Sequence, residues 1–277
     1  MLKKVVVIVG SGGIGLAIAR RQGIGKTLLL ADVNEKTLNT AASVLRDASY
    51  EVETRHVDVA SPESVRALAA TALALGDVVE VINTAGLSPN MASVEKILEV
   101  DLYGVAVMLE EFGHVIAPGG AGLTISSMAG YMMPALPPEQ DHALAYTPSD
   151  EVLKLPFLSG SAIPNTLVAY MLAKRANHLR VQAAAMIWGK RGARINSISP
   201  GIIVTPLAQH ELNSEIGEIY RAMVAASPVK RMAPPDEIAT AAAYLLGPDA
   251  GFITGSDLLI DGGVIAAMKA GKLPTPG

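Results

Sequence analysis

Short apolar runs alternate along this chain with longer segments in which apolar residues recur every three or four positions. A run of four or five apolar residues is typical of a buried β-strand, and the longer spacing is typical of a helix. The strands predicted in this way cover residues 5–9, 27–30, 53–57, 78–82, 122–125, 194–197 and 257–260. The predicted helices cover 15–21, 35–47, 62–74, 93–113, 165–188, 208–224 and 235–246, and Ser61 is the expected N-cap of the third.

This alternation determines the fold class. Parallel strands need crossover helices, and strands that are apolar throughout are buried on both faces. The sequence therefore predicts an α/β fold, a single-domain Rossmann-type doubly wound parallel sheet of about seven strands with helices on both faces. No internal repeat or linker divides residues 1–277. Residues 128–164 differ from the rest, because they are rich in proline, methionine and acidic residues and are long for a connection, which indicates a functional or mobile segment.

Composition and charge exclude several classes of protein. Hydrophobic residues make up 50% of the chain, which is enough for a large core. The net charge of −4 argues against a nucleic-acid partner, because such proteins present a basic surface. No apolar stretch has the length of a membrane span, and the N-terminal run is too short for a signal peptide. The absence of cysteine excludes disulfides and thiolate metal sites, the five histidines lack metal-site spacing, and we expect a cytoplasmic protein without a metal.

A glycine-rich turn joins the first predicted strand to the first predicted helix. Gly10, Gly12 and Gly15 fit the pattern G-x-G-x-x-G, in which the backbone turns tightly and approaches a pyrophosphate at the helix N-terminus. Asp32 ends the second strand, where a carboxylate can accept hydrogen bonds from an adenosine ribose and would repel a 2′-phosphate. No arginine follows it in residues 33–35, so the sequence favours NAD over NADP. The alternatives are a purely structural turn and a capping aspartate.

Tyr170 and Lys174 are four residues apart in a predicted helix, so both lie on one face. That spacing alone is common in helices without catalytic function. Here it follows a strand that ends at Ser126 and Ser127, and ligands of open α/β sheets bind outside the carboxyl ends of the strands. The ordinary pKa of a phenol, about 10, is too high for a base at neutral pH, but a nearby ammonium and a cationic nicotinamide favour the phenolate.

With these residues in this order, the chain resembles the short-chain dehydrogenase/reductase family over nearly its whole length. The matching motifs are the glycine turn at 10–15, Asp32, Asp58-Val59, Asn83-Thr84-Ala85-Gly86, Ile125-Ser126-Ser127, Tyr170 with Lys174, the run from Asn196 to Gly201 that continues to Thr205, and Asp261-Gly262-Gly263. The resemblance implies that Tyr170 is the general acid in ketone reduction and the base in alcohol oxidation. It implies that Ser127, in preference to Ser126, hydrogen-bonds the substrate oxygen, and that Lys174 holds the nicotinamide ribose and lowers the tyrosine pKa.

The resemblance also implies a cofactor-binding set. Asp58 would face the adenine, and Thr205 would approach the nicotinamide carboxamide. The set comprises Gly10, Gly12, Gly13, Ile14, Gly15, Asp32, Asp58, Val59, Asn83, Ala85, Gly86, Tyr170, Lys174, Pro200, Gly201, Ile203 and Thr205. A homo-oligomer, either a dimer or a tetramer, is implied as well, because the helix that carries the tyrosine commonly pairs between subunits in this family.

The chain departs from the family's pattern at three places. Val9 stands where the glycine turn usually begins with threonine, and the turn is one residue shorter. Asp101 stands where the family has a catalytic asparagine, whose main-chain carbonyl holds a water linked to the lysine; the aspartate could act through its backbone or pair with Lys174 or with water. The third departure is an insertion before Tyr170, similar to that of bacterial hydroxysteroid dehydrogenases/carbonyl reductases. The segment 128–164 contains this insertion. It is either a lid over a substrate cleft or a surface excursion or subunit contact, and the sequence favours neither interpretation.

The leading hypothesis is an NAD(H)-dependent oxidoreductase that interconverts a secondary alcohol and a ketone. The methionine-rich insert favours an apolar or bulky small-molecule substrate, such as a hydroxysteroid. The alternative from another class is a non-catalytic dinucleotide-binding sensor or regulator, which has no chemical reason to keep Ser127, Tyr170 and Lys174 together. An epimerase or dehydratase of the related extended type is disfavoured, because the C-terminal part is short.

Overall fold

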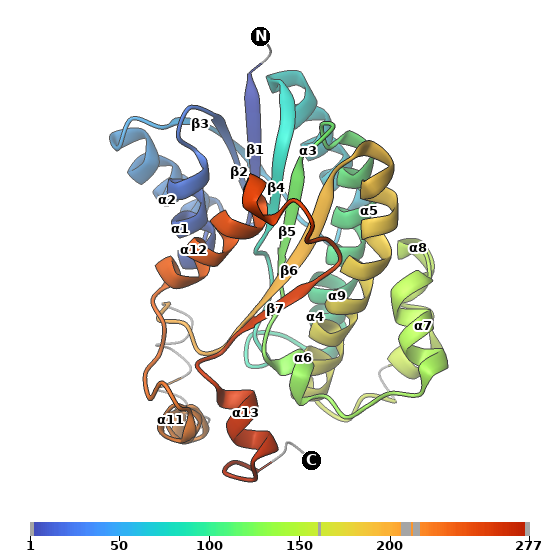
Figure 1. Ribbon diagram of the computed structural model, residues 1–277. Helices are drawn as coiled ribbons and strands as arrows, with labels where there is room; N and C mark the ends of the chain where they lie inside the picture. The colour runs from blue at the N-terminus through green and yellow to red at the C-terminus, as the bar shows by residue number, and fades with distance from the viewer. Residues whose placement is uncertain (1–2, 160–161, 206–211, 213–216, 275–277) are drawn as a thin grey trace.

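The computed structural model describes residues 3–159, 162–205, 212 and 217–274 (Figure 1). Within them all seven predicted strands form, and they make one parallel sheet in the order β3-β2-β1-β4-β5-β6-β7. The strands are β1 (Lys4–Val9), β2 (Thr27–Asp32), β3 (Glu51–His56), β4 (Asp77–Asn83), β5 (Ala121–Ile125), β6 (Arg194–Pro200) and β7 (Asp257–Ile260). The strand order reverses between β1 and β4, and ligands of doubly wound sheets bind at such a switch point.

Helices cover both faces of the sheet. α1 (Gly13–Gln22), α2 (Glu35–Asp47) and α12 (Pro235–Leu246) lie on one face, and α3 (Pro62–Leu75), α5 (Val105–Val115) and α9 (Thr166–Trp188) lie on the other (Figure 1). Alternate residues of β1 enter the two cores, with Val5, Val7 and Val9 in one and Val6 and Ile8 in the other. The prediction of a Rossmann-type sheet, made from such continuously apolar strands, is confirmed.

Side-chain hydrogen bonds cap the N-termini of α3 and α9. Ser61 accepts a backbone N–H of the first turn of α3 at 3.3 Å, so its predicted role as N-cap is confirmed. Asn165 caps α9 in the same way at 2.9 Å. At the other end of α9, Trp188 is buried and donates its indole N–H to the carbonyl of Leu109 in α5 at 3.0 Å. The long helix is therefore held at both ends.

The predicted helix over 93–113 is divided in the structure. α4 (Val94–Ile97) is followed by a π-helical segment, η1 (Leu98–Gly104), and then by α5. Such π-bulges occur frequently at functional sites. Asp101 lies within η1, and the segment ends at Gly104, where an added Cβ would lie 2.8 Å from Cγ2 of Val59. The bulge and the close packing at its end together fix the position of Asp101.

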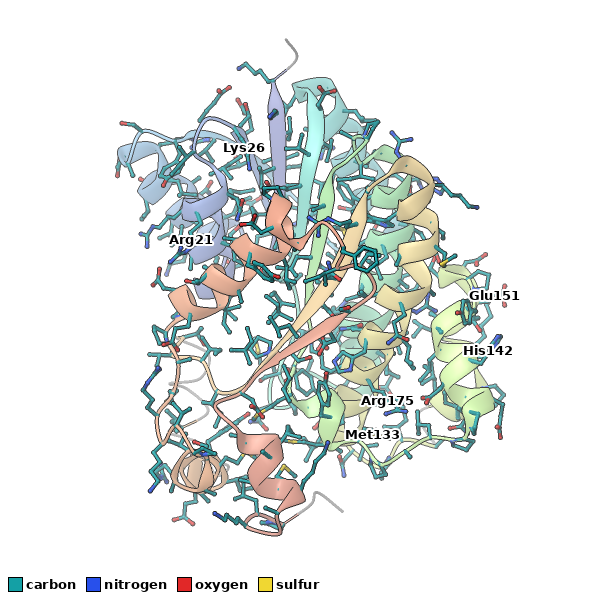
Figure 2. The ribbon with its side chains drawn as sticks, in the orientation of Figure 1. Arg21, Lys26, Met133, His142, Glu151 and Arg175 are labelled. Carbon is teal, nitrogen blue, oxygen red and sulfur yellow. The ribbon has the colours of Figure 1, made fainter. Side chains whose placement is uncertain are left out.

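The described residues of the segment 128–164 contain three short α-helices, α6 (Ala129–Met132), α7 (Pro138–Tyr146) and α8 (Ser149–Val152), and a short 3-10 helix, η2 (Pro156–Leu158). α7 packs along α9, and Arg175 of α9, labelled in Figure 2, points toward α7. Its Nε donates to the Asp141 carboxylate of α7 at 2.9 Å. Leu144 and Val152 are fully buried between these helices and α9. The described part of the insert thus has a small core of its own against the outer side of α9.

Two further helices lie beyond the carboxyl ends of the strands (Figure 1). α11 (Gly217–Ala226) overlaps the predicted helix 208–224, of which residues 208–211 and 213–216 lie outside the described residues. α13 (Val264–Lys269) was not predicted, and it packs against α11. Among the helices of the described residues, none is long and apolar enough to cross a membrane.

Candidate active site

A cavity of about 580 Å³ lies outside the carboxyl ends of β4, β5 and β6. Segments that follow these three strands form its floor, and α9 contributes Tyr170 and Lys174 to its wall. The remaining wall is largely apolar and comes from α6, α11 and the C-terminal segment, with Met128, Met132, Ile219, Ala222, Met223, Leu273 and Pro274. The cavity therefore combines a polar end near α9 with an apolar space large enough for a small molecule.

The predicted serine, tyrosine and lysine all line this cavity. Lys174 Nζ lies 5.2 Å from the centroid of the Tyr170 ring, as their placement one turn apart requires. Ser127 follows β5 and is partly exposed, and its Oγ accepts the Ala129 N–H at 3.1 Å. The Ser126 hydroxyl is buried and donates to the carbonyl of Lys174 at 2.9 Å, which ties β5 to α9. Ser127 is thus the more accessible of the two serines.

Lys174 faces a second buried charge. Its ammonium lies 3.7 Å from Oδ2 of Asp101, and both side chains are almost completely enclosed. Burial acts to lower the pKa of Lys174, but the Asp101 carboxylate, aided by Tyr170, outweighs burial and raises it above its usual value. Burial raises the pKa of Asp101, against the opposing effects of Lys174 and of the Leu87 N–H, which donates to Oδ1 at 2.8 Å. The lysine is therefore held in its charged form.

The glycine turn has the geometry of a tight strand-to-helix connection. Gly10 has a φ of 90°, and an added Cβ would lie 2.5 Å from Oγ1 of Thr84. On Gly15 a Cβ would lie 2.0 Å from the carbonyl oxygen of Gly10. Gly12, the N-cap of α1, has no described atom within 4 Å of its Cβ position, so the start of the helix faces open space. Gly13 faces Thr205, whose Cγ2 would lie 3.2 Å from an added Cβ.

The two predicted acidic residues each accept hydrogen bonds from backbone N–H groups after a strand end. Asp32 accepts the Ser11 N–H at 2.7 Å and the Asn34 N–H at 2.8 Å, so its carboxylate holds the glycine turn against the end of β2. Asp58 follows β3 and accepts the Ala60 N–H at 2.9 Å. The structural interpretation of Asp32 as a turn aspartate is thus visible, and it leaves further lone pairs on each carboxylate for a ligand.

The other predicted cofactor residues differ in accessibility. Ile14, Gly86, Pro200, Gly201, Ile203 and Thr205 line the cavity. Asn83 is buried and accepts the Ala85 N–H at 3.1 Å, so it shapes the loop after β4. Val59 is buried against Gly104. Asn83, Ala85 and Val59 do not line the cavity and instead affect its shape.

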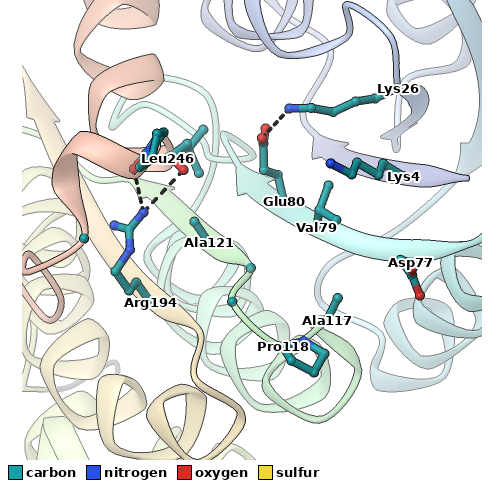
Figure 3. A pocket seen from close by; sticks show the side chains of 15 residues that line it. Lys4, Lys26, Asp77, Val79, Glu80, Ala117, Pro118, Ala121, Arg194 and Leu246 are labelled. Carbon is teal, nitrogen blue, oxygen red and sulfur yellow. Dashed lines mark hydrogen bonds and ion pairs between the residues drawn. The ribbon is translucent and has the colours of Figure 1, made fainter.

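A second cavity of about 760 Å³ lies at the opposite, amino-terminal edge of the sheet (Figure 3). Three of its charged side chains, those of Lys26, Glu80 and Arg194, have partners within the protein. Lys26 pairs with Glu80, and Arg194 donates to the carbonyls of Leu245 at 2.7 Å and Gly247 at 2.9 Å. It brings together none of the residues predicted to be catalytic, so we assign the active site to the carboxyl edge.

Comparison with known proteins identifies the family of this chain. A sequence profile described as short chain dehydrogenase matches residues 3–138, and one described as Enoyl-(Acyl carrier protein) reductase matches residues 142–265. A short-chain dehydrogenase/reductase of Alternaria brassicicola is 41% identical over 270 residues, which are 97% of this chain and 98% of the relative. The chain belongs to the short-chain dehydrogenase/reductase family. It is therefore a member of a family of oxidoreductases that bind a nicotinamide dinucleotide.

Two further comparisons show how far the similarity extends. A 3-alpha-hydroxysteroid dehydrogenase/carbonyl reductase of Comamonas testosteroni is 30% identical over 188 residues, 67% of this chain and 72% of the relative. The solved structure of a 7 alpha-hydroxysteroid dehydrogenase complexed with NADH and 7-oxo glycochenodeoxycholic acid has a TM-score of 0.75 at 23% identity, and the match covers 94% of this chain and 93% of that one. The second similarity shows the shared fold.

The short-chain dehydrogenase/reductase cofactor fits the residues present at the glycine turn. Open space at Gly12 allows a pyrophosphate to reach the N-terminus of α1, and the buried Ser11 hydroxyl beside it has no hydrogen-bond partner within the described residues. Asp32 accepts the Ser11 N–H on one side of the turn, and Thr205, which lines the cavity, faces Gly13. Among the described residues, no cluster of histidine, aspartate and glutamate could hold a metal ion.

Sequence reasoning did not single out much of the apolar wall of the cavity. Leu87 and Pro89 follow the predicted motif at 83–86, whereas Leu273 and Pro274 lie near the end of the chain. The motif could have indicated the first pair, since residues after a strand end face the same crevice. Nothing in the sequence indicates the second pair, because their proximity to the site arises from the turn of the chain after α13.

Proposed function

We propose that this protein is an NAD(H)-dependent oxidoreductase that interconverts a secondary alcohol and a ketone. The observation that carries the proposal is the meeting of Ser127, Tyr170 and Lys174 in one cavity, with the ammonium 5.2 Å from the phenol ring. A bound nicotinamide dinucleotide would supply the hydride exchange with the substrate carbon. The protein's own residues then have to orient the substrate and handle one proton.

Each residue of this set has a separate role in the proposal. The Ser127 hydroxyl donates to the substrate oxygen and orients it. The Tyr170 hydroxyl gives its proton to that oxygen during reduction, and the phenolate takes the proton back during oxidation. The Lys174 ammonium holds the nicotinamide ribose and favours ionisation of the neighbouring phenol through its positive charge. Ser126 supports the arrangement by fixing the Lys174 carbonyl.

NAD is proposed as the preferred cofactor on electrostatic grounds. Asp32 places a carboxylate at the end of β2, anchored by two backbone N–H groups, where it would repel the 2′-phosphate of NADP. No arginine stands in residues 33–35 to bind such a phosphate. The remaining predicted cofactor residues, including Asp58, Asn83 and Thr205, are proposed to hold the same molecule.

An apolar and bulky substrate is proposed from the lining of the cavity. No carboxylate, histidine or arginine stands among its described lining residues, and the largest group among them is methionine, isoleucine and leucine side chains. A rigid apolar ketone would bury its surface there without leaving charged groups unpaired. The 3-alpha-hydroxysteroid dehydrogenase/carbonyl reductase among the relatives is consistent with a hydroxysteroid-like compound as one such substrate.

The two parts of the segment 128–164 are proposed to differ in role. Its first turn, with Met128 and Met132, borders the substrate space, whereas α7 and α8 pack on α9 and α5. We propose that the later part supports α9 from outside, and that any homo-oligomer, dimer or tetramer, forms without separating α7 from α9. A cytoplasmic location is part of the same proposal.

The decisive experiment assays the purified protein on a panel of cyclic ketones and secondary alcohols with NAD(H) and NADP(H). We expect turnover of apolar ketones with NADH, followed by the absorbance of the reduced nicotinamide, and a loss of at least about a thousandfold in kcat for Tyr170→Phe. The matched control is Tyr146→Phe, because Tyr146 is an exposed residue of α7 outside the cavity.

Two outcomes would contradict the proposal. Undiminished turnover in Tyr170→Phe would remove the proton-transfer role of this residue. Dinucleotide binding without turnover of any compound in the panel would favour the sensor or regulator, which needs the fold and the groove but no acid or base.

A further inference from the structure

Asp101 presents an unusual arrangement in the interior of the site. Its side chain is completely buried in the π-helical segment η1. Oδ1 accepts the Leu87 N–H at 2.8 Å, whereas Oδ2 lies 3.7 Å from Lys174 Nζ and has no hydrogen-bond partner among the residues that the structure describes. Gly86 leaves room for the pair, since a Cβ there would lie 3.1 Å from both Asp101 Oδ1 and Lys174 Nζ.

This arrangement places one negative charge directly behind the positive charge that faces Tyr170. Opposite charges interact strongly in a buried environment, because little water is present to screen them. An ammonium that is paired with a carboxylate on one side exerts a weaker field on the phenol on its other side. An asparagine in the same place would leave the field of Lys174 undiminished.

The other charged groups near Lys174 are directed elsewhere. On α9, Arg175 pairs with Asp141 of the insert, and His178 contacts Ser199 of β6. On the α4–η1 side, Glu99 is exposed and pairs with Lys96. The described lining of the cavity includes Lys174 as its one cation and no carboxylate. Lys174 and Asp101 therefore dominate the local field at the phenol.

We propose that the Asp101 carboxylate cancels part of the field of Lys174, so that Tyr170 stays protonated to higher pH and acts as a proton donor over a wider pH range. This inference rests on the proposed function and refines it. Ketone reduction needs the protonated phenol, whereas alcohol oxidation needs the phenolate. The enzyme would therefore reduce ketones well above neutral pH, and its oxidation of alcohols would begin only at more alkaline pH.

The direct test measures the ionisation of Tyr170 without any substrate or cofactor. The ultraviolet absorbance of phenolate is titrated for the protein and for its Tyr170→Phe variant, and the difference isolates Tyr170 from the other six tyrosines. We expect Asp101→Asn to lower the pKa of Tyr170 by about one pH unit. Asp141→Asn is the matched control, because it neutralises a carboxylate that pairs with the next residue of α9, and we expect it to leave that pKa unchanged.

The same variants give an independent kinetic readout. In Asp101→Asn, the rise of kcat/KM for alcohol oxidation and the fall of kcat/KM for ketone reduction should both move to lower pH by the amount found in the titration. An unchanged or raised pKa of Tyr170 in Asp101→Asn would overturn the inference, since the carboxylate would then be neutral or would be needed to keep Lys174 charged.

Two further measurements distinguish a variant that fails to fold, and a failure of the proposed function, from a failure of this inference. Asp101→Ser also removes the charge and keeps an oxygen near the Leu87 N–H, so it replaces Asp101→Asn if that variant does not fold by circular dichroism. If no alcohol or ketone is turned over, the proposed function fails, while the titration of Tyr170 still decides whether Asp101 sets its acidity.

Discussion

Two glycines of the glycine turn lack a side chain for different physical reasons, one for folding and one for ligand binding. Gly15 allows the first turn of α1 to pack on the carbonyl of Gly10, so its lack of a side chain serves the fold. Gly12 contacts no described atom from its Cβ position, so its lack of a side chain serves whatever approaches from outside. Two glycines three residues apart thus have different physical purposes.

Substitution of these two glycines should give opposite results. Gly15→Ala would force a Cβ to 2.0 Å from a backbone oxygen, so we expect a lower Tm and loss of soluble protein. Gly12→Ala should leave the Tm within about a degree, because the site is open, but raise the dissociation constant of NADH at least about tenfold by obstructing the pyrophosphate. Thermal unfolding and fluorescence titration with NADH measure the two effects. An equal loss of Tm in both variants would contradict this division.

The elements around the site differ in how far the sequence revealed them. The central strands β1 and β5 could be predicted because they are almost entirely buried and apolar, whereas the edge strand β3 is polar and largely unburied and was indicated by little more than its place between two helices. The motifs at 10–15, 83–86 and 126–127 could be placed at one edge, because parallel strands all end there. The division of 93–113 could not be predicted, since an inserted π-turn leaves the helical periodicity of the sequence almost unchanged. α7 escaped prediction because only Leu144 in it is buried.

The candidate site was predicted in its residues but not in its contacts. Tyr170 and Lys174 were predicted from their spacing together with the resemblance to the family, and Ser127 from that resemblance; the structure places all three in one cavity. The pairing of Asp101 with Lys174 joins residues of different helices, so no local pattern could decide among the alternatives of backbone, lysine or water. The structure shows the lysine pair for the side chain.

Two helices of the insert are expected to differ in role, because α7 packs on α9 whereas α6 borders the cavity. Leu144 of α7 is fully buried against α9, so Leu144→Ala should lower the free energy of unfolding by about 3 kcal/mol and leave KM for ketones unchanged. Met132 of α6 lines the cavity, so Met132→Ala should change KM for bulky ketones several-fold with a smaller effect on stability. Denaturant unfolding and steady-state kinetics measure both. A large KM effect of Leu144→Ala would favour α7 as part of a lid.

Across the whole molecule, a polar cluster joins the last two strands to the helices that bear the site. His178 of α9 contacts Ser199 of β6 at 2.8 Å through Nε2, and the Tyr131 hydroxyl of α6 donates to Asp257 of β7 at 2.8 Å. His178 Nε2 also lies 3.7 Å from the Asp257 carboxylate. This cluster connects the segment after Ser127 and the helix that carries Tyr170 to the same edge of the sheet.

The cluster predicts an acid-sensitive stability. Burial lowers the pKa of His178; Asp257 opposes this effect, and Arg175 and Lys174 reinforce it. The unfolded chain binds a proton near pH 6.5, whereas the folded chain binds it only at lower pH, so stability should be full above about pH 6.5 and decline below it. His178→Gln should flatten that part of the profile of Tm against pH. An unchanged slope in this variant would assign the acid sensitivity to other groups.

The burial of Trp188 has a practical consequence. It is the one tryptophan of the chain, and its indole is enclosed at the seam where α9 meets α5. Its emission should therefore report a single location, with a blue-shifted spectrum while the seam is closed and a red shift when water enters. A stopped-flow record of that colour change would time the release of the long helix from its neighbour without any attached dye.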